Sequence, residues 1–337
     1  MTAAPGQPDV QHDTASLDLG TDGAVAIEGR TPWQIVRSRL RRDKVTMAAL
    51  VICIVFLVLA IISPLLTRLG ALDPYTGNLK LVQGVGSLPE GAMGGISAAH
   101  PLGVEPGTGR DMLSRIVAGL TVSLTVATLA TLFSVVVGTT LGIVAGFARG
   151  WLDWVISRAM DLVLSFPSTL MLLSLSAVLI STMTDVFKFP PGAPATIAFM
   201  VLVLGFFGWP FFARIMRGQV LSLREREFIE AAQSLGARRG RIYFKELLPH
   251  LWAPILVYVT LILPQNIAAE AALGFLGVGI QAPTPSFGSI LNDSVTYALP
   301  DPAYFIIPGL ALVTLVLAFN LLGDGLRDAL DPKSGRS

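Results

Sequence analysis

Six long apolar stretches constrain this chain more than any other feature of its sequence. Each is long enough, as a helix, to cross a hydrocarbon core about 30 Å thick. A segment in lipid must satisfy its own backbone hydrogen bonds, and an α-helix does so. We therefore predict an all-α polytopic membrane protein with six transmembrane helices. They are expected over residues 45–66, 116–148, 154–183, 195–213, 250–275 and 303–322.

Composition supports this fold class and excludes others. The chain has 337 residues, of which 53% are hydrophobic and 14% charged, less charge than a soluble domain carries. Its net charge of +1 argues against a nucleic-acid-binding protein. The single cysteine, Cys53, excludes an intramolecular disulfide and a multi-cysteine metal site.

Motifs for catalysis are also missing from the sequence. No Gly-Lys dipeptide occurs, so the chain has no Walker A loop, and ATP bound with Mg²⁺ has to be hydrolysed by another chain. Neither G-x-S-x-G nor H-E-x-x-H is present. We expect no catalytic residue, no metal site and no cofactor in this chain.

The distribution of Lys and Arg predicts the orientation in the membrane. With the N-terminus inside, only five of the 24 basic residues fall in outer segments, namely Arg68, Lys80, Arg110, Arg115 and Lys188. Positive charge accumulates on the cytoplasmic side of membrane proteins. Both termini and the loop 214–249 are therefore expected in the cytoplasm, and the loop 67–115 outside.

The two ends of the chain differ from its centre. Residues 1–30 are acidic and poor in apolar side chains, which predicts a disordered tail. Residues 31–44 carry apolar and basic side chains on opposite faces, as an interfacial amphipathic helix does. The membrane domain follows over 45–322, and 323–337 are expected to form a cytoplasmic C-terminal tail.

The most charged stretch, residues 222–250, predicts a helical hairpin at the membrane surface. Phe228, Ala231, Ala232 and Leu235 recur at helical spacing, and Gly236 supplies the left-handed position that ends this helix. A second helical segment places Ile242, Tyr243 and Leu247 on one side and basic residues around the rest, and Pro249 is expected to reset the chain before the next span. A hairpin with an apolar edge and a basic rim is a docking element for a soluble partner.

The hairpin also carries a family resemblance. Glu230-Ala231-Ala232, Gly236 and Leu248-Pro249 resemble the EAA loop of ABC importer permeases, whose coupling helix contacts the ATP-hydrolysing subunit. Glu246, followed by Leu247, stands where the motif usually has Ile. By this resemblance the coupling residues are Glu230, Ala231, Ala232, Leu235, Gly236, Ala237, Leu248 and Pro249.

Three further blocks resemble the C-type permeases of dipeptide and oligopeptide ABC importers. The run HPLGVEPGTGRDMLSRI is similar to HPLGTD-x-x-GRD-x-LSR, with Val104-Glu105 in place of Thr-Asp and one extra residue before Gly109. The run after Glu270 is similar to E-x-x-LSFLGLG, with Phe287 where Trp is common. FNLLGDGLRDALDPK closes the chain like the C-terminal signature of these permeases, so the resemblance covers residues 31–333.

Membership of this family would imply a type I ABC importer permease fold in a bacterial cytoplasmic membrane. The implied partners are a homologous B-type permease, two ATP-binding subunits, an extracytoplasmic substrate-binding protein and membrane lipid. The implied cargo is peptides, with glutathione, nickel or another small solute as the alternative. A stand-alone secondary transporter and an aspartyl intramembrane protease built on Asp161 and Asp324 are the other functions considered; a docking hairpin would serve neither.

Polar residues inside apolar stretches are candidates for a substrate path. Gln265, Asn266 and Glu270 lie in the fifth stretch, and Asp161 lies near the inner end of the third. Charged groups in a membrane avoid lipid. Glu270 is therefore expected either to line an aqueous path or to be a buried strut. Asp161 is expected either to line the path or to pair with Arg158.

Three glycines in the second stretch, Gly138, Gly142 and Gly146, recur at a spacing of four. Small residues on one helical face allow two membrane helices to approach closely. We expect this face to pack against another span.

Overall fold

The computed structural model describes residues 38, 40–41, 43–91, 93–148 and 150–330. Helices form nearly all the regular structure of this part of the chain, with one isolated β-bridge between Val104 and Asp111. The predicted tail over 1–30, and most of the predicted interfacial helix over 31–44, lie outside the described residues. The helices are α2 (Lys44–Arg68), α3 (Met112–Phe147), α4 (Trp151–Ser165), α5 (Ser168–Asp185), α6 (Ala193–Leu223), α7 (Glu227–Ser234), α8 (Arg239–Arg241), α9 (Leu248–Phe275), α10 (Phe287–Val295) and α11 (Pro302–Leu330), with a π-helical segment over Ile242–Leu247 and a 3₁₀ turn over Leu79–Leu81.

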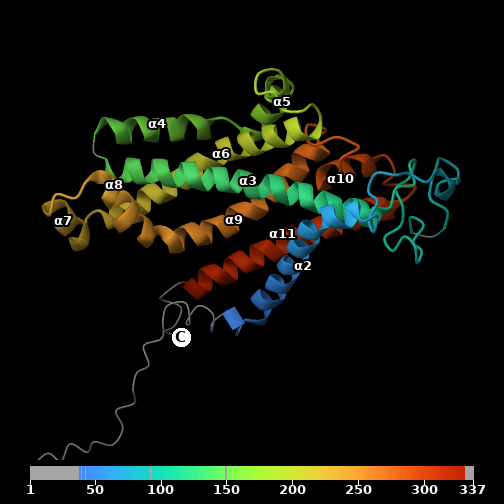
Figure 1. Ribbon diagram of the computed structural model, residues 1–337, viewed down its shortest axis with the longest axis horizontal. Helices are drawn as coiled ribbons and strands as arrows, with labels where there is room; N and C mark the ends of the chain where they lie inside the picture. Colours follow the sequence, from blue (N-terminus) through green and yellow to red (C-terminus); the bar gives the residue numbers. More distant parts are fainter. Residues whose placement is uncertain (1–37, 39, 42, 92, 149, 331–337) are drawn as a thin grey trace, which may run out of the picture.

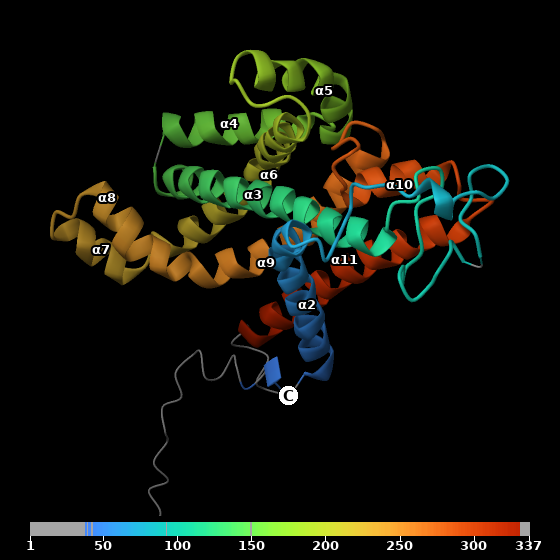
Figure 2. The same ribbon diagram turned by 45° about the vertical axis from the view of Figure 1, so that its right-hand side comes forward.

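Within these residues six helices are long and apolar enough to span a membrane: α2, α3, α5, α6, the continuous run Arg239–Phe275 and α11. Figures 1 and 2 show α3 along the length of the molecule, with α7 and α8 at one end and the loop between α2 and α3 at the other. The hairpin and this loop therefore lie at opposite ends of the bundle. The sequence-based expectation of six spans is confirmed.

The third apolar stretch, 154–183, is divided into two helices rather than forming one interrupted span. Helix α4 ends at Ser165, Pro167 precedes α5, and Phe166 and Pro167 are both extended. Proline disfavours helical geometry in the residue before it, which explains the break. Figure 1 shows α4 alongside α3 while α5 turns away and is seen nearly end-on. Only α5 is among the six candidate spans.

The most extensive packing between two helices of the bundle lies between α3 and α6, at the three evenly spaced glycines. A Cβ on Gly138 would lie 2.9 Å from the Trp209 carbonyl oxygen; one on Gly142 would lie 2.7 Å from that of Ala213. A Cβ on Gly146 would lie 2.7 Å from the Val220 Cβ. Backbone atoms cannot move aside cheaply, so glycine sets the distance between these two helices.

Helix α11 continues through 323–330, which the sequence assigned to a tail. Gly323 packs against Thr260 of α9, and Gly325 packs against Thr46 of α2. Because neither glycine has a side chain, the last turns of α11 can pack closely on α9 and on α2. This packing stabilises the helix beyond the apolar stretch. Residues 331–337 are outside the described part of the chain.

A buried ionic cluster holds the loop between α2 and α3 onto the bundle. Arg115 of α3 is fully buried, 3.6 Å from a Glu105 carboxylate oxygen and 3.8 Å from Asp293 of α10. Tyr304 of α11 donates a hydrogen bond to Glu105 at 2.6 Å, and the Arg110 side chain pairs with the same carboxyl. Burial raises the pKa of Glu105, but the Arg115 charge and donated hydrogen bonds outweigh burial and leave that pKa below its usual value.

Candidate functional site

The hairpin after α6 is built on a buried apolar side. Ile229 of α7 is fully buried, together with Ile242 and Leu247 of the π-helical segment. These three side chains pack in one cluster with residues of α3, α6 and α9. Gly236 has φ +75°, a left-handed conformation that strains residues with a Cβ, and it ends α7. The hairpin is therefore a fixed part of the bundle rather than a loose loop.

The opposite side of α7 is open and carries the residues of the coupling motif. Glu230, Ala231 and Gly236 are exposed, and Leu235 is 88% exposed. Ala232 and Ala237 are half-buried, so they lie at the edge of this surface. An exposed leucine beside two alanines is an apolar patch with little bulk, which suits insertion of the helix into a groove of another protein.

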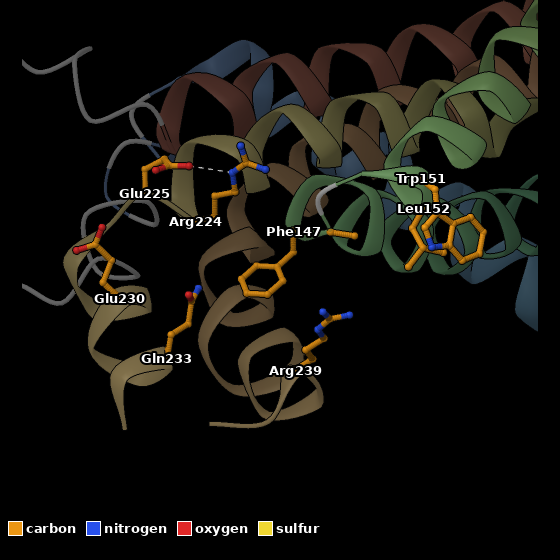
Figure 3. A pocket seen from close by; sticks show the side chains of 9 residues that line it. Phe147, Trp151, Leu152, Arg224, Glu225, Glu230, Gln233 and Arg239 are labelled. Atoms are coloured by element: carbon orange, nitrogen blue, oxygen red, sulfur yellow. Dashed lines mark hydrogen bonds and ion pairs between the residues drawn. The ribbon is translucent and has the colours of Figure 1, made fainter. Parts of the chain in front are cut away.

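A hollow of about 480 Å³ lies beside α7, between the hairpin and the turn that joins α3 to α4. Figure 3 shows its side chains: Glu230 and Gln233 come from α7, Arg239 from α8, and Phe147 and Trp151 from the α3–α4 turn. Arg224 also lines it and donates a hydrogen bond to the Gly146 carbonyl at 3.0 Å, which joins the ends of α6 and α3. The hollow presents both acidic and basic groups next to the open face of α7.

The second half of the hairpin runs into the membrane without a break, contrary to the reset predicted at Pro249. Residues 239–275 form one continuous helical run, in which Leu248 is half-buried and Pro249 is exposed. The π-helical turn over Ile242–Leu247 comes directly before this proline. Proline lacks an N–H and collides with the preceding turn of an α-helix, and a wider turn accommodates it. The hairpin and the fifth span are thus one mechanical element.

A second hollow, of about 300 Å³, lies between α5, α6 and α9 and opens to the surface, since Phe211 and Leu276 in its lining are both 52% exposed. Gln265 is exposed and Asn266 is buried, and both line it. Asn266 also donates a hydrogen bond to Thr131 of α3 at 2.9 Å. The other lining residues are apolar or neutral: Ser168, Thr169, Leu172, Leu204, Phe207, Gly208, Phe211, Ile262, Ala269, Ala272, Leu273 and Leu276. This hollow offers hydrogen-bonding groups without a charged side chain.

The other two candidates for the substrate path do not line this hollow. Glu270 is fully buried on the side of α9 that faces α3 and α10. The hydroxyls of Ser123 and Ser286 lie next to its carboxyl, but neither makes a well-formed hydrogen bond to it. Asp161 of α4 accepts a hydrogen bond from Arg214 of α6 at 2.7 Å, and Arg158 lies 3.8 Å away.

Sequence reasoning missed two residues that hold the hairpin in place. Ile229 did not belong to the apolar face predicted for the first hairpin helix, although it lies next to Phe228 and is more deeply buried. His250 stacks on Phe228, with ring centroids 4.7 Å apart and ring planes at 19°. The pair Phe228-Ile229 is the one signal in the sequence that could have indicated a wider buried face.

A bundle of six candidate spans, with a rigid surface hairpin continuous with one span and a polar hollow beside that span, has the architecture of a membrane subunit of a transporter. The family models agree with this class. A model described as a binding-protein-dependent transport system inner membrane component matches residues 138–336, and one for the N-terminal transmembrane domain of oligopeptide transport permease C matches residues 31–81. The chain belongs to the family of binding-protein-dependent transport system inner membrane components, and it is a multi-pass inner membrane protein.

Curated relatives match nearly the whole chain. The dipeptide transport system permease protein DppC of Alkalihalophilus pseudofirmus is 38% identical over 303 residues, 90% of each chain. The glutathione transport system permease protein GsiD of Pectobacterium atrosepticum is 36% identical over 304 residues, 90% of this chain and 92% of its own. GsiD of Escherichia coli is 35% identical over 305 residues, 90% of this chain and 91% of its own.

Solved structures support the fold. A chain of the methionine ABC transporter MetNI in an inward-facing conformation superposes with a TM-score of 0.52 at 22% identity. The match covers 65% of this chain and 98% of that chain. The expectation of an ABC importer permease fold is confirmed.

Proposed function

We propose that this chain is the C-type permease of an ATP-driven importer that moves short peptides across the cytoplasmic membrane. The observation that carries the proposal is the hairpin, whose coupling motif is exposed while its other side is buried in the membrane bundle. The substrate class comes from the relatives, which are named for dipeptides and for glutathione, itself a tripeptide. The uncharged hollow beside α9 suits peptide groups of varied side chain.

The partners in this proposal are a homologous B-type permease, two ATP-binding subunits and an extracytoplasmic substrate-binding protein. ATP and Mg²⁺ would be bound by the ATP-binding subunits, one of which would cover the exposed face of α7 and the adjacent hollow. Movement of α7 would reach α9 through the Phe228–His250 stack and the continuous helix 239–275. Such a movement changes the populations of inward- and outward-facing states only if the partner contacts the hairpin differently in each.

The substrate path would run along the hollow between α5, α6 and α9, with Gln265 and Asn266 as its polar contacts. Glu270 would serve as a strut between α9 and the start of α10. Asp161 would hold α4 against α6 through its pair with Arg214. Neither acid needs to contact the substrate.

The importer proposal is tested by reconstituting the complete complex in proteoliposomes and adding its binding protein to the medium outside them. We expect ATP-dependent uptake of labelled dialanine. Uptake of labelled glutathione in place of dialanine would narrow the substrate to that tripeptide, and uptake of Ni²⁺ alone would overturn the peptide assignment. Uptake without co-purifying ATP-binding subunits would contradict the importer class.

The orientation is part of the proposal and has its own test. In a Cys53→Ser background, a cysteine at Ser87 of the outer loop and one at Ser234 of α7 are both exposed positions. An impermeant thiol reagent on intact cells should label the first and not the second, as the distribution of basic residues predicts. Labelling at Ser234 alone would show that the chain has the opposite orientation in the membrane.

A further inference from the structure

An apolar groove of about 400 Å³ runs between α3 and α9. Val136 of α3 lines it and is 56% exposed, whereas Gly138 faces α6. Phe244 and Trp252 line the other wall and are 71% and 64% exposed. The groove begins at the hairpin and extends toward the middle of the bundle. We expect an apolar groove of this size in a membrane protein to be covered by another molecule.

The wall of the groove does not suit a tightly packed helix. Its lining contains no glycine, alanine or serine; all of it is branched aliphatic or aromatic except Thr139 and Thr140. Helices in a membrane associate through small residues that let backbones approach. On α3 those residues already face α6. A flexible hydrocarbon chain fits an uneven wall of large side chains better than a helix does.

One polar atom in the groove lacks a partner. The Thr139 side chain is 8% exposed, and its hydroxyl makes no hydrogen bond within the described chain. The neighbouring Thr140 hydroxyl donates to the Val136 carbonyl at 2.7 Å, as threonines in membrane helices usually do. The Thr139 oxygen is closed to solvent, so it is an unsatisfied group within the groove wall, and the chemistry of the occupant follows from the charged residues near the groove instead.

The mouth of the groove is basic. Arg241 lies three residues before Phe244, one helical turn away, and Lys245 follows Phe244 directly; both basic side chains are exposed. Trp252 on the rim is the residue type that favours headgroup depth. Basic residues next to a membrane span attract anionic lipids of the cytoplasmic leaflet.

We propose that the groove between α3 and α9 binds an acyl chain of one anionic phospholipid, with the headgroup phosphate held by Arg241 and Lys245. The site rests on the proposed position of the hairpin at the cytoplasmic surface. It goes beyond the proposed transport function, because the lipid would contact α3 and the helical run 239–275 at the point where the hairpin enters the membrane.

The test uses the complete importer in nanodiscs that contain a phosphatidylglycerol with a photoreactive group in its acyl chain, or the matching phosphatidylcholine. After irradiation, mass spectrometry locates the labelled peptides. We expect labelling of the groove by phosphatidylglycerol in preference to phosphatidylcholine. Val136→Phe, which fills the groove, should remove the label. Val313→Phe at a 60% exposed position of α11 is the matched control and should keep it.

A second variant keeps the test independent of packing. Arg241→Gln with Lys245→Gln should reduce the preference for phosphatidylglycerol by about fivefold for each basic side chain removed. Equal labelling by both lipids, or label retained in Val136→Phe, would overturn the proposal. Uptake measured on proteoliposomes of the same lipid composition separates the two proposals, since transport without groove labelling rejects the lipid site alone.

Discussion

Phe228 of α7 stacks on His250 at the start of α9, with ring centroids 4.7 Å apart and ring planes at 19°. His250 is held in turn by its Nδ1, which donates to the Glu246 carbonyl at 2.6 Å. The stack joins the first helix of the hairpin to the helix that also lines the polar hollow. In our account it is one of the contacts that carry movement of α7 into the membrane.

We expect Phe228→Ala to weaken this link while leaving the exposed face of α7 in place. Loss of the ring removes an aromatic contact of about 1 kcal/mol and some buried area. ATP-binding subunits should still bind, but stimulation of ATP hydrolysis by the loaded binding protein should fall. Phe228→Tyr keeps the ring and is the control. Unchanged stimulation in Phe228→Ala would show that the stack carries no coupling.

Filling the hollow between α5, α6 and α9 should block transport. Ala269 lines the hollow, whereas Ala268 is exposed beside it and does not. We expect Ala269→Phe to lower peptide uptake at least tenfold, about 1.4 kcal/mol in the transport barrier, with the complex still assembled. Ala268→Phe adds the same bulk one residue away and should retain uptake. Similar uptake by both variants would move the path elsewhere.

Glu270 is predicted to be a strut. The Ser123 hydroxyl accepts from the Phe287 N–H and that of Ser286 accepts from the Ser289 N–H, both at 3.2 Å, so each hydroxyl proton is free to point at the carboxyl. Glu270→Gln retains an acceptor oxygen and should transport normally. Glu270→Leu removes the acceptor and should lower the yield of assembled complex. A transport defect in Glu270→Gln with full assembly would instead assign Glu270 to the path.

The ionic cluster of Glu105, Arg115 and Asp293 should make stability depend on pH. The pKa of Glu105 is below its usual value, so this carboxylate stabilises the fold above the usual glutamate pKa, and the contribution is lost as pH falls through the lowered pKa. Glu105→Gln leaves Arg115 buried with one partner fewer, which should cost about 3 kcal/mol at neutral pH. The pKa of Asp293 is raised, first by burial and then by the Glu105 charge. The contribution of Asp293 to stability therefore changes with pH in the direction opposite to that of Glu105.

Because Glu105 itself raises the pKa of Asp293, the thermal unfolding of wild type and Glu105→Gln is compared across acidic pH in an Asp293→Asn background, where only the glutamate differs. The difference in melting temperature should shrink as pH falls. A difference that is constant with pH would contradict the ionised state of Glu105.

The sequence was sufficient for the number of spans, for the small-residue face of α3 and for the turn at Gly236, because each depends on local composition or backbone geometry. It was not sufficient where packing decides. In the sequence, Glu270 is an unusual acid within an apolar stretch, whether it lines a path or is a buried strut. The strut is favoured by its neighbours Ser123 and Ser286, which the sequence does not place beside it. Pro249 was expected to reset the chain, but a π-helical turn allows the helix to continue through it. The pairing of Asp161 with Arg214 joins residues 53 positions apart, which no local pattern indicates.

The central claim is that the hairpin couples this permease to its ATP-binding subunits. Ala232→Glu places a charged, bulky side chain at the edge of the docking face, and Gly236→Val puts a Cβ at φ +75°, at a cost of about 1 kcal/mol or more. Ala232→Gln adds similar bulk without charge. Gly218→Val makes the same change at an exposed helical position with open space around it.

Subunit stoichiometry and substrate-stimulated ATP hydrolysis of the purified complex test this claim most directly. We predict that Ala232→Glu and Gly236→Val insert in the membrane but lose the ATP-binding subunits or the stimulation, that Ala232→Gln is intermediate, and that Gly218→Val resembles wild type. The affinity of the binding protein for its ligand should not change in any variant. Full stoichiometry with wild-type stimulated hydrolysis in both Ala232→Glu and Gly236→Val would contradict the account.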